Sequence, residues 1–293
     1  MIHHADLHIH TVYSDGTDTL TELLTKVRRN RIDFFSITDH DEIRGSEIML
    51  RMLSEDTQEE DPLFVPGVEF SCRDEKGKYH ILGYAYDPGS ESVQDMVKVF
   101  HAIRMHKFAG RLAFLRAEYG IVFDDWEVAM LRSLNNPGKP HIGKLIVKHG
   151  YADNVSEAIR NYLNNYHGGE RRIRPEEAIE AVLKSGGIPV LAHGVFGDGD
   201  QLLDEDEMEE RVTRLAGCGL QGIECFYSRY TPQQQALMLK LRDRHGLYAT
   251  AGSDYHGTNK PVALGNIGVD DPETAVPYLD EFTEAIKKSL NKS

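Results

Sequence analysis

The chain has 293 residues, a mean hydropathy of -0.44 and a formal net charge of -14, which describe a globular protein and exclude a short peptide module. No stretch approaches the roughly 20 apolar residues that span a bilayer, and the first residues have neither a basic start nor an apolar run, so we expect no membrane insertion, no secretory signal and a cytoplasmic location. Three cysteines at unrelated spacings predict neither a disulfide framework nor a CxxC metal site.

Strands and helices are predicted to alternate from the first residues onward. The runs ADLHIH, FFSITDH, FVPGVEFSC and KYHILGYAY are short and rich in β-branched or aromatic residues, which is typical of strands. Between the first two, the stretch TLTELLTKVRRNRI has the apolar spacing of a helix, with Thr19 or Thr21 as its N-cap. After Ser92 the pattern becomes helical, and strands return as IPVLAHG, LQGIECF and YATAGSDYHG, each preceded by a helical stretch.

This alternation favours parallel pairing of the strands and a closed or nearly closed α/β barrel. Residues 1–97 and 173–293 are predicted to form the barrel. Residues 98–172 are predicted to form an inserted, all-helical subdomain that covers the active site.

The net charge is divided unevenly along the chain. Residues 98–174 contain thirteen Lys or Arg against seven Asp or Glu, a balance of +6, so the remainder carries -20. The basic segment is either a solvated helical surface or a lid that attracts an anionic substrate. Residues 198–210 contain eight carboxylates, which indicate either a solvated loop leading into a helix or a mobile acidic flap near the site.

Polar residues gather at the ends of the predicted strands, and in a parallel barrel these ends open on one face. In a strand, the period of two places His8 and His10 on the same side. Imidazole and carboxylate without thiolate suit Mn²⁺, Fe²⁺ or Zn²⁺. The candidate ligands outnumber those of one ion and point to two or three ions: His8, His10, Asp15, His40, Glu69, His80, His193, Asp254 and His256.

Such a centre predicts phosphoester hydrolysis. Clustered ions lower the pKa of a bridging water, which as hydroxide is the expected nucleophile, and they stabilise the charge of in-line displacement. His193 and Asp254 are both candidates for proton relay, and the residues alone do not choose between them. Arg104, His141 and Arg229 are candidates for binding a second phosphate, although a solvated arginine or a helix-capping histidine is an equally ordinary role.

Six motifs in order, DLHIHTVYSDG, TDHD, GVEFSC, HILGY, LAHG and GSDYHG, resemble the polymerase and histidinol phosphatase (PHP) domain of the amidohydrolase superfamily. The resemblance covers residues 5–97 and 175–268 and implies a distorted (β/α)7 TIM-like barrel with three divalent ions, Mn²⁺ first and Fe²⁺ or Zn²⁺ as alternatives. The ligand sets that it implies are His8, His10, Glu69 and Asp254; Asp15, His40 and His256; and Glu69, His80 and His193, with Glu69 bridging.

Within this family, the insertion containing KPHIGKLIVKHGY most resembles enzymes acting on nucleoside 3′,5′-bisphosphates and on 5′ ends of short RNA, which implies that the insertion closes over the phosphate. The acidic run after His193 would repel a long polyanion, so the expected partner is a small phosphorylated substrate, such as a nucleotide, and no long nucleic acid. The alternatives are a cyclic phosphodiesterase, a 5′-3′ exoribonuclease on short RNA, a histidinol-phosphate phosphatase and a non-catalytic metal-stabilised module. No protein partner follows from the sequence.

Overall fold

The computed structural model describes residues 4–55, 61–134, 137–168, 171–198 and 201–290. The chain forms two compact units, one of Met1–Val97 with Ile173–Ser293 and one of Lys98–Arg172. Across the residues described, none of the helices combines the length and the apolar character needed to cross a membrane.

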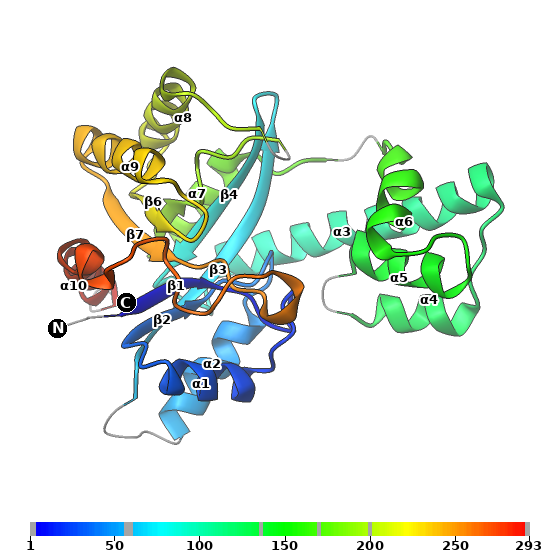
Figure 1. The fold of residues 1–293 in the computed structure, drawn as a ribbon, viewed down its shortest axis with the longest axis horizontal. Helices are drawn as coiled ribbons and strands as arrows, with labels where there is room; N and C mark the ends of the chain where they lie inside the picture. The colour runs from blue at the N-terminus through cyan, green and yellow to red at the C-terminus, as the bar shows by residue number, and fades with distance from the viewer. Residues whose placement is uncertain (1–3, 56–60, 135–136, 169–170, 199–200, 291–293) are drawn as a thin grey trace. The chain divides into compact units, whose positions relative to one another are not determined.

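The first unit contains one sheet whose seven strands follow chain order (Figure 1). The strands are β1 (Ala5–Ile9), β2 (Phe34–Ile37), β3 (Leu63–Asp74), β4 (Gly77–Tyr84), β5 (Ile188–Leu191), β6 (Gly222–Tyr227) and β7 (Tyr248–Gly252). Each strand pairs with the next, and a bridge between Ile9 and Tyr255 joins the first edge to the last. The sheet is therefore nearly closed, which confirms the predicted α/β barrel.

The expectation of parallel pairing throughout is wrong for one strand. β4 runs antiparallel to both β3 and β5, while the other pairs are parallel. The cause is the short connection between β3 and β4, in which only Glu75 and Lys76 separate Asp74 from Gly77. A two-residue turn can join only antiparallel strands, because a parallel crossover needs a dozen residues or more. Gly77 provides the required positive φ of 131°.

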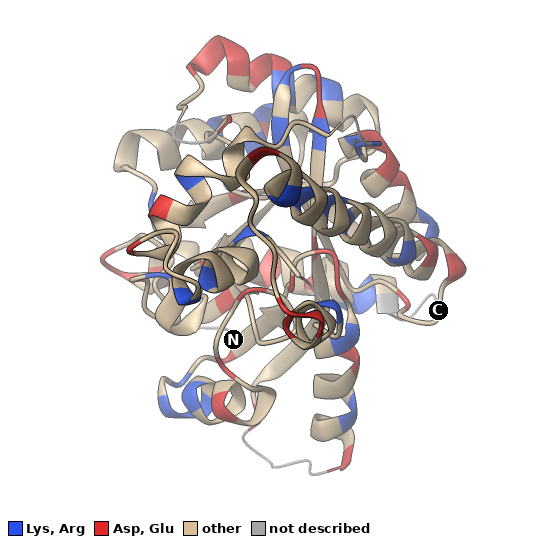
Figure 2. Ribbon diagram, turned by 90° about the vertical axis from the view of Figure 1, so that its right-hand side faces the viewer, with Lys and Arg blue, Asp and Glu red and all other residues tan. Residues whose placement is uncertain are grey.

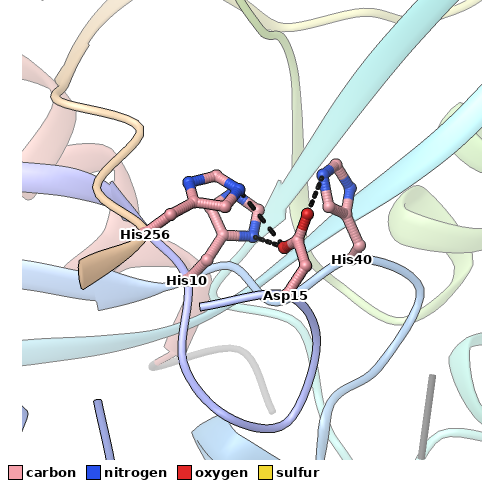
Figure 3. A group of neighbouring side chains, drawn as sticks. All are labelled: His10, Asp15, His40 and His256. Carbon is pink, nitrogen blue, oxygen red and sulfur yellow. Dashed lines mark ion pairs between the residues drawn. The ribbon is translucent and has the colours of Figure 1, made fainter. Parts of the chain in front are cut away.

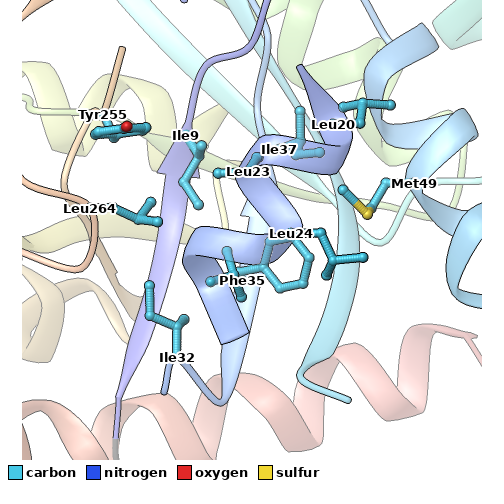
Figure 4. Packing of buried hydrophobic residues seen from close by; sticks show 11 residues of the cluster. Ile9, Leu20, Leu23, Leu24, Ile32, Phe35, Ile37, Met49, Tyr255 and Leu264 are labelled. Atoms are coloured by element: carbon cyan, nitrogen blue, oxygen red, sulfur yellow. The ribbon is translucent and has the colours of Figure 1, made fainter. Parts of the chain in front are cut away.

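Helices pack outside the sheet: α1 (Leu20–Arg29), α2 (Arg44–Glu55), α7 (Pro175–Lys184), α8 (Glu205–Gly217), α9 (Pro232–His245) and α10 (Val276–Leu290), with short 3₁₀ turns at Gly257–Asn259 and Pro272–Ala275. Thr19 caps α1 in a capping box with Glu22, as one of the two expected alternatives. Leu23 and Leu24 of α1 pack in one buried cluster with Ile9 of β1 (Figure 4).

This packing fixes which side of β1 faces the barrel interior. Ile9 points toward α1, and neighbouring residues of a strand point to opposite faces. Asp6, His8 and His10 therefore share the other face, and all three are fully buried. The HxH pair lies on one side of the strand, as its spacing predicts.

The second unit is helical in the part that the structure describes. α3 (Glu91–Tyr119) begins in the first unit, and most of its length belongs to the second, which continues with α4 (Asp125–Arg132), α5 (Lys139–Lys148), α6 (Val155–Asn161) and the 3₁₀ turn Leu163–Asn165. It has its own buried cluster, including Phe108, Leu115 and Ile142.

Candidate metal centre

The nine candidate ligands lie in the strands of the barrel or in the loops that directly follow these strands. Every strand except β6 contributes at least one of them in this way. They are His8 in β1, His10 and Asp15 after it, His40 after β2, Glu69 in β3, His80 in β4, His193 after β5, and Asp254 and His256 after β7. In the antiparallel pair β3 and β4, Glu69 lies opposite Leu82 and Ser71 opposite His80, which places Glu69 and His80 on the same face.

One oxygen of Glu69 faces three histidines from the first two strands. Glu69 is fully buried, and its Oε2 lies 3.2 Å from His8 Nε2, 3.1 Å from His10 Nε2 and 3.2 Å from His40 Nδ1. Asp254 Oδ1 completes this group at 3.3 Å from His10 Nε2 and 3.7 Å from His8 Nε2.

The other oxygen of Glu69 faces two histidines from β4 and the end of β5. Its Oε1 lies 2.7 Å from His80 Nδ1 and 3.2 Å from His193 Nε2, and these two nitrogens are 3.3 Å apart. Histidine nitrogens thus face both carboxylate oxygens of Glu69, which is the geometry of a carboxylate that bridges two ions.

A further group forms around Asp15 in the loop after β1 (Figure 3). Asp15 Oδ1 lies 3.2 Å from His256 Nε2 and 3.6 Å from His10 Nδ1, and its Oδ2 lies 4.0 Å from His40 Nε2. This group contains the expected Asp15, His40 and His256, with His10 in addition.

Most of the separations around Glu69 fit divalent ions, whereas those from Asp15 to His10 and His40 are wider, at 3.6 and 4.0 Å. Bonds of about 2.0–2.2 Å to one ion put neighbouring ligand atoms roughly 3.0–3.5 Å apart. Four buried atoms of the candidate ligands have no hydrogen bond: His8 Nε2, His10 Nε2, His256 Nε2 and Glu69 Oε2. Leaving such an atom unsatisfied costs about 1–3 kcal/mol, a penalty that coordination to a cation would remove.

The carboxylates are held in the charged form that a cation requires. Burial alone would raise the pKa of Glu69, but the neighbouring His40, His80 and His8 outweigh burial and keep that pKa well below its ordinary value. Burial likewise acts to raise the pKa of Asp254, but the close approach of His10 and the charge of His8 keep that pKa well below its usual range.

Asp254 is enclosed from its other side by two residues that the sequence analysis did not identify. Its Oδ2 accepts hydrogen bonds from Lys260 Nζ at 2.7 Å and from the Tyr227 hydroxyl at 3.0 Å. Its φ is +59°, a left-handed conformation that is uncommon outside glycine. The two contacts fix the orientation in which Oδ1 faces the histidines.

Three buried carboxylates around the centre were also not predicted as site residues. Asp39 accepts hydrogen bonds from the Thr11 N–H at 2.8 Å and the Ser14 hydroxyl at 2.6 Å, which holds the loop that carries Asp15. Asp6 joins β1 to the end of β7 through the Ser253 N–H at 2.9 Å. Glu224 of β6 contacts His8 and His193.

The three candidate substrate-binding residues lie in different surroundings. Arg229 is exposed, with its guanidinium 4.9 Å from the centre of the Phe196 ring, which in turn lies 6.5 Å from the His193 ring. Arg104 and His141 belong to the helical unit. His141 Nδ1 accepts a hydrogen bond from the Gly138 N–H at 3.1 Å, so this histidine caps the start of α5.

The acidic run of residues 198–210 leads into a helix, which is one of the two structures predicted for it. Asp204 is the N-cap of α8, and Gly199 and Asp200 lie outside the described residues. Several carboxylates of the run are paired with cations: Asp198 with Arg73, Glu205 with Lys240, Glu209 with Arg244, and Glu210 with Lys76. Both signs of charge are distributed along the helices (Figure 2). The run is therefore less repulsive toward an anion than its composition suggests.

Comparison with known proteins identifies the family. The model of the PHP domain matches residues 6–223. The chain is 27% identical over 278 residues to the 5′-3′ exoribonuclease Rnm of Salmonella typhimurium strain LT2, covering 89% of this chain and 87% of the relative. It is 28% identical over 260 residues to the 3′,5′-nucleoside bisphosphate phosphatase of Chromobacterium violaceum, covering 86% of each.

A third relative and a solved structure agree with these matches. The phosphoribosyl 1,2-cyclic phosphate 1,2-diphosphodiesterase of Eggerthella lenta is 29% identical over 259 residues, covering 86% of this chain and 94% of the relative. The structure of a protein from Bifidobacterium adolescentis, described as a metal-dependent phosphoesterase, has a TM-score of 0.76 and 28% identity, covering 94% of this chain and 95% of that one. The chain belongs to the PHP domain family and is a metal-dependent phosphoesterase, a hydrolase of phosphate esters.

Proposed function

We propose that this enzyme removes phosphate from small, multiply charged esters of the nucleoside 3′,5′-bisphosphate class, with two or three divalent ions in the Glu69 centre and Mn²⁺ as the first candidate. The observation that carries this proposal is the convergence of eight of the nine candidate ligands in three overlapping groups, with the ninth, His193, 3.2 Å from Glu69 Oε1 and four buried ligand atoms left without hydrogen bonds. Ions bound there would lower the pKa of a water and neutralise phosphoryl oxygens. The 28% identity to a bisphosphate phosphatase supports the substrate class.

The residues of the chain divide this work. With ions bound, His8, His10, Glu69 and Asp254 would hold one, Asp15, His40 and His256 a second, and Glu69, His80 and His193 a third. His193 is the favoured proton-relay residue, because 17% of its side chain is exposed, whereas Asp254 is enclosed by Lys260 and Tyr227. Arg229 of the barrel unit, and Arg104 and His141 of the helical unit, are each candidates for binding the phosphate remote from the cleaved bond.

The test is phosphate release by protein stripped of metal with a chelator and then given Mn²⁺. We expect release from adenosine 3′,5′-bisphosphate to require the ion and to fall by at least about a hundredfold in Asp15→Asn, because the amide lacks the charge that a cation ligand supplies. Asp153→Asn, which changes an exposed carboxylate of the helical unit, is the matched control and should keep full activity. Turnover that persists without metal would contradict the proposal.

Cleavage at a 5′-phosphorylated RNA end is a second candidate function. The cation-paired state of the acidic run weakens the electrostatic argument against RNA, and a 5′-3′ exoribonuclease is 27% identical to this chain. The same Mn²⁺-loaded protein should therefore be given 5′-phosphorylated short RNA, a cyclic phosphodiester and histidinol phosphate. A ladder of shortened RNA faster than bisphosphate turnover would favour the exoribonuclease, and ring opening would favour the cyclic phosphodiesterase.

A further inference from the structure

The buried Glu224 of β6 connects two histidines that face different oxygens of Glu69: His8 faces Oε2 and His193 faces Oε1. Its side chain is fully enclosed. Its Oε1 lies 3.0 Å from His8 Nδ1, and its Oε2 accepts a hydrogen bond of 2.7 Å from the backbone N–H of His193. Glu224 belongs to none of the three groups of candidate ligands. Its side chain instead contacts two of the candidate ligand residues, His8 and His193.

The hydrogen bond to His8 determines which ring nitrogen can meet a cation. An ionised carboxylate only accepts hydrogen bonds, so the proton of neutral His8 must sit on Nδ1. The lone pair is then on Nε2, the atom that lies 3.2 Å from Glu69 Oε2 and has no hydrogen bond. A partner on the far nitrogen is the usual way in which proteins orient a metal-binding imidazole.

The second hydrogen bond holds a strained backbone. His193 has a φ of +28°, a conformation that is strained for a residue other than glycine. The surrounding structure must fix this conformation, and the Glu224 carboxylate does so through the N–H of the same residue. The His193 ring is thereby directed to the Oε1 side of Glu69.

We infer that Glu224 is a positioning residue for the metal centre: one oxygen fixes the proton of His8 on Nδ1, and the other sets the backbone from which His193 reaches Glu69. This inference rests on the proposed metal site.

Glu224→Gln tests the inference with almost no change in shape. The amide has one acceptor and one donor, whereas both of its neighbours need an acceptor. If the NH₂ group of the new glutamine faces His8, the His8 proton moves to Nε2 and blocks the atom that would coordinate the ion. If this NH₂ group faces His193, it meets the His193 backbone N–H, and two hydrogen-bond donors lie together in a buried place. We expect Mn²⁺ affinity to fall about 10- to 100-fold. Glu127→Gln is the matched control, because Glu127 is also a buried, hydrogen-bonded glutamate but lies in the helical unit.

The measurement is a Mn²⁺ titration of the metal-free full chain, in which electron paramagnetic resonance reports the free ion, with circular dichroism to show that each variant is folded. Wild-type protein that binds no Mn²⁺ would contradict the proposed metal site itself. Wild-type binding together with unchanged affinity in folded Glu224→Gln would overturn the role of Glu224 alone. If Glu224→Gln does not fold, Glu224→Asp replaces it: this carboxylate is one methylene too short to reach both partners, and wild-type affinity there would overturn the inference.

Discussion

Gly252, the last residue of β7, lies where the backbone packs tightly against His8, one of the candidate ligands. A Cβ atom there would sit 2.3 Å from His8 Cβ and 2.7 Å from Glu224 Oε1. Gly252→Ala must therefore push β7 away from β1, and we expect a loss of about 1–3 kcal/mol in the free energy of unfolding. Urea denaturation measures this loss.

Gly217 is the control for this prediction. It ends α8, and a Cβ there would meet nothing within 4 Å. Gly217→Ala should be neutral or stabilising, by up to about 1 kcal/mol, because alanine loses less backbone freedom in a helix. Equal stability of Gly252→Ala and Gly217→Ala would show that the strands beside the centre can separate freely.

At the level of single residues, the sequence predicts the relative orientation of residues that are close together in the chain. The alternation of His8 and His10 already requires a common face. Glu224 stands alone in the apolar run GIECF, and its proximity to His8 depends on strands separated by about two hundred residues. No local pattern indicates that contact, and the same holds for Lys260 and Tyr227 beside Asp254.

Among the elements, α4 of the helical unit carries a charge whose pairing makes stability depend on pH. The Glu127 side chain is 1% exposed and accepts hydrogen bonds from Lys148 Nζ at 2.7 Å and from His149, its Nε2 lying at 2.8 Å. The bond from Lys148 is the main reason that the pKa of Glu127 is lowered from 4.5 to about 2. A carboxyl group whose pKa is lower in the folded state stabilises that state above its unfolded pKa and loses this effect as the pH falls toward the folded value.

We therefore expect the stability difference between wild type and Glu127→Gln to be largest at neutral pH and to shrink as the pH falls from about 4.5 toward 2. Urea unfolding of both proteins at pH 7, 5, 4 and 3.5 measures the difference. Glu157→Gln, at a half-buried position of α6 whose carboxylate accepts hydrogen bonds from the uncharged Asp153 N–H and Asn161 amide, should show a smaller dependence. A constant difference across this range would mean that Glu127 titrates normally in the folded protein.

The direction of a strand is a property that the pattern of apolar residues does not determine. Both β3 and β4 are visible as apolar runs, but a run has no direction. The absence of a helix between them was the available signal, since residues 75–76 can form only a tight turn. The helices after Ser92 could be predicted because apolar positions recur there with the period of a helix. These positions include Phe108 and Leu115, which lie in the buried cluster of the helical unit.

In the whole molecule, chemistry and stability are distributed between two units. All nine candidate ligands lie in Met1–Val97 or Ile173–Ser293, and each unit has a buried cluster of its own. An ion that binds only the folded state stabilises it by RT ln(1 + [L]/Kd), about 2.7 kcal/mol at a hundredfold excess over Kd. This stabilisation should belong to the unit that contains the ligands.

Hydrogen exchange with mass spectrometry separates the units without dividing the chain. On addition of Mn²⁺ to metal-free protein, we expect slower exchange in peptides from β1, β3, β4 and β7 and little change in α4, α5 and α6, because exchange reports local opening free energies. Phosphate added after Mn²⁺ should then slow exchange in α5 if the helical unit closes over the phosphate. Equal slowing of both units by Mn²⁺ alone would show instead that they open together, so that a metal centre built entirely by the barrel governs the stability of the insertion as well.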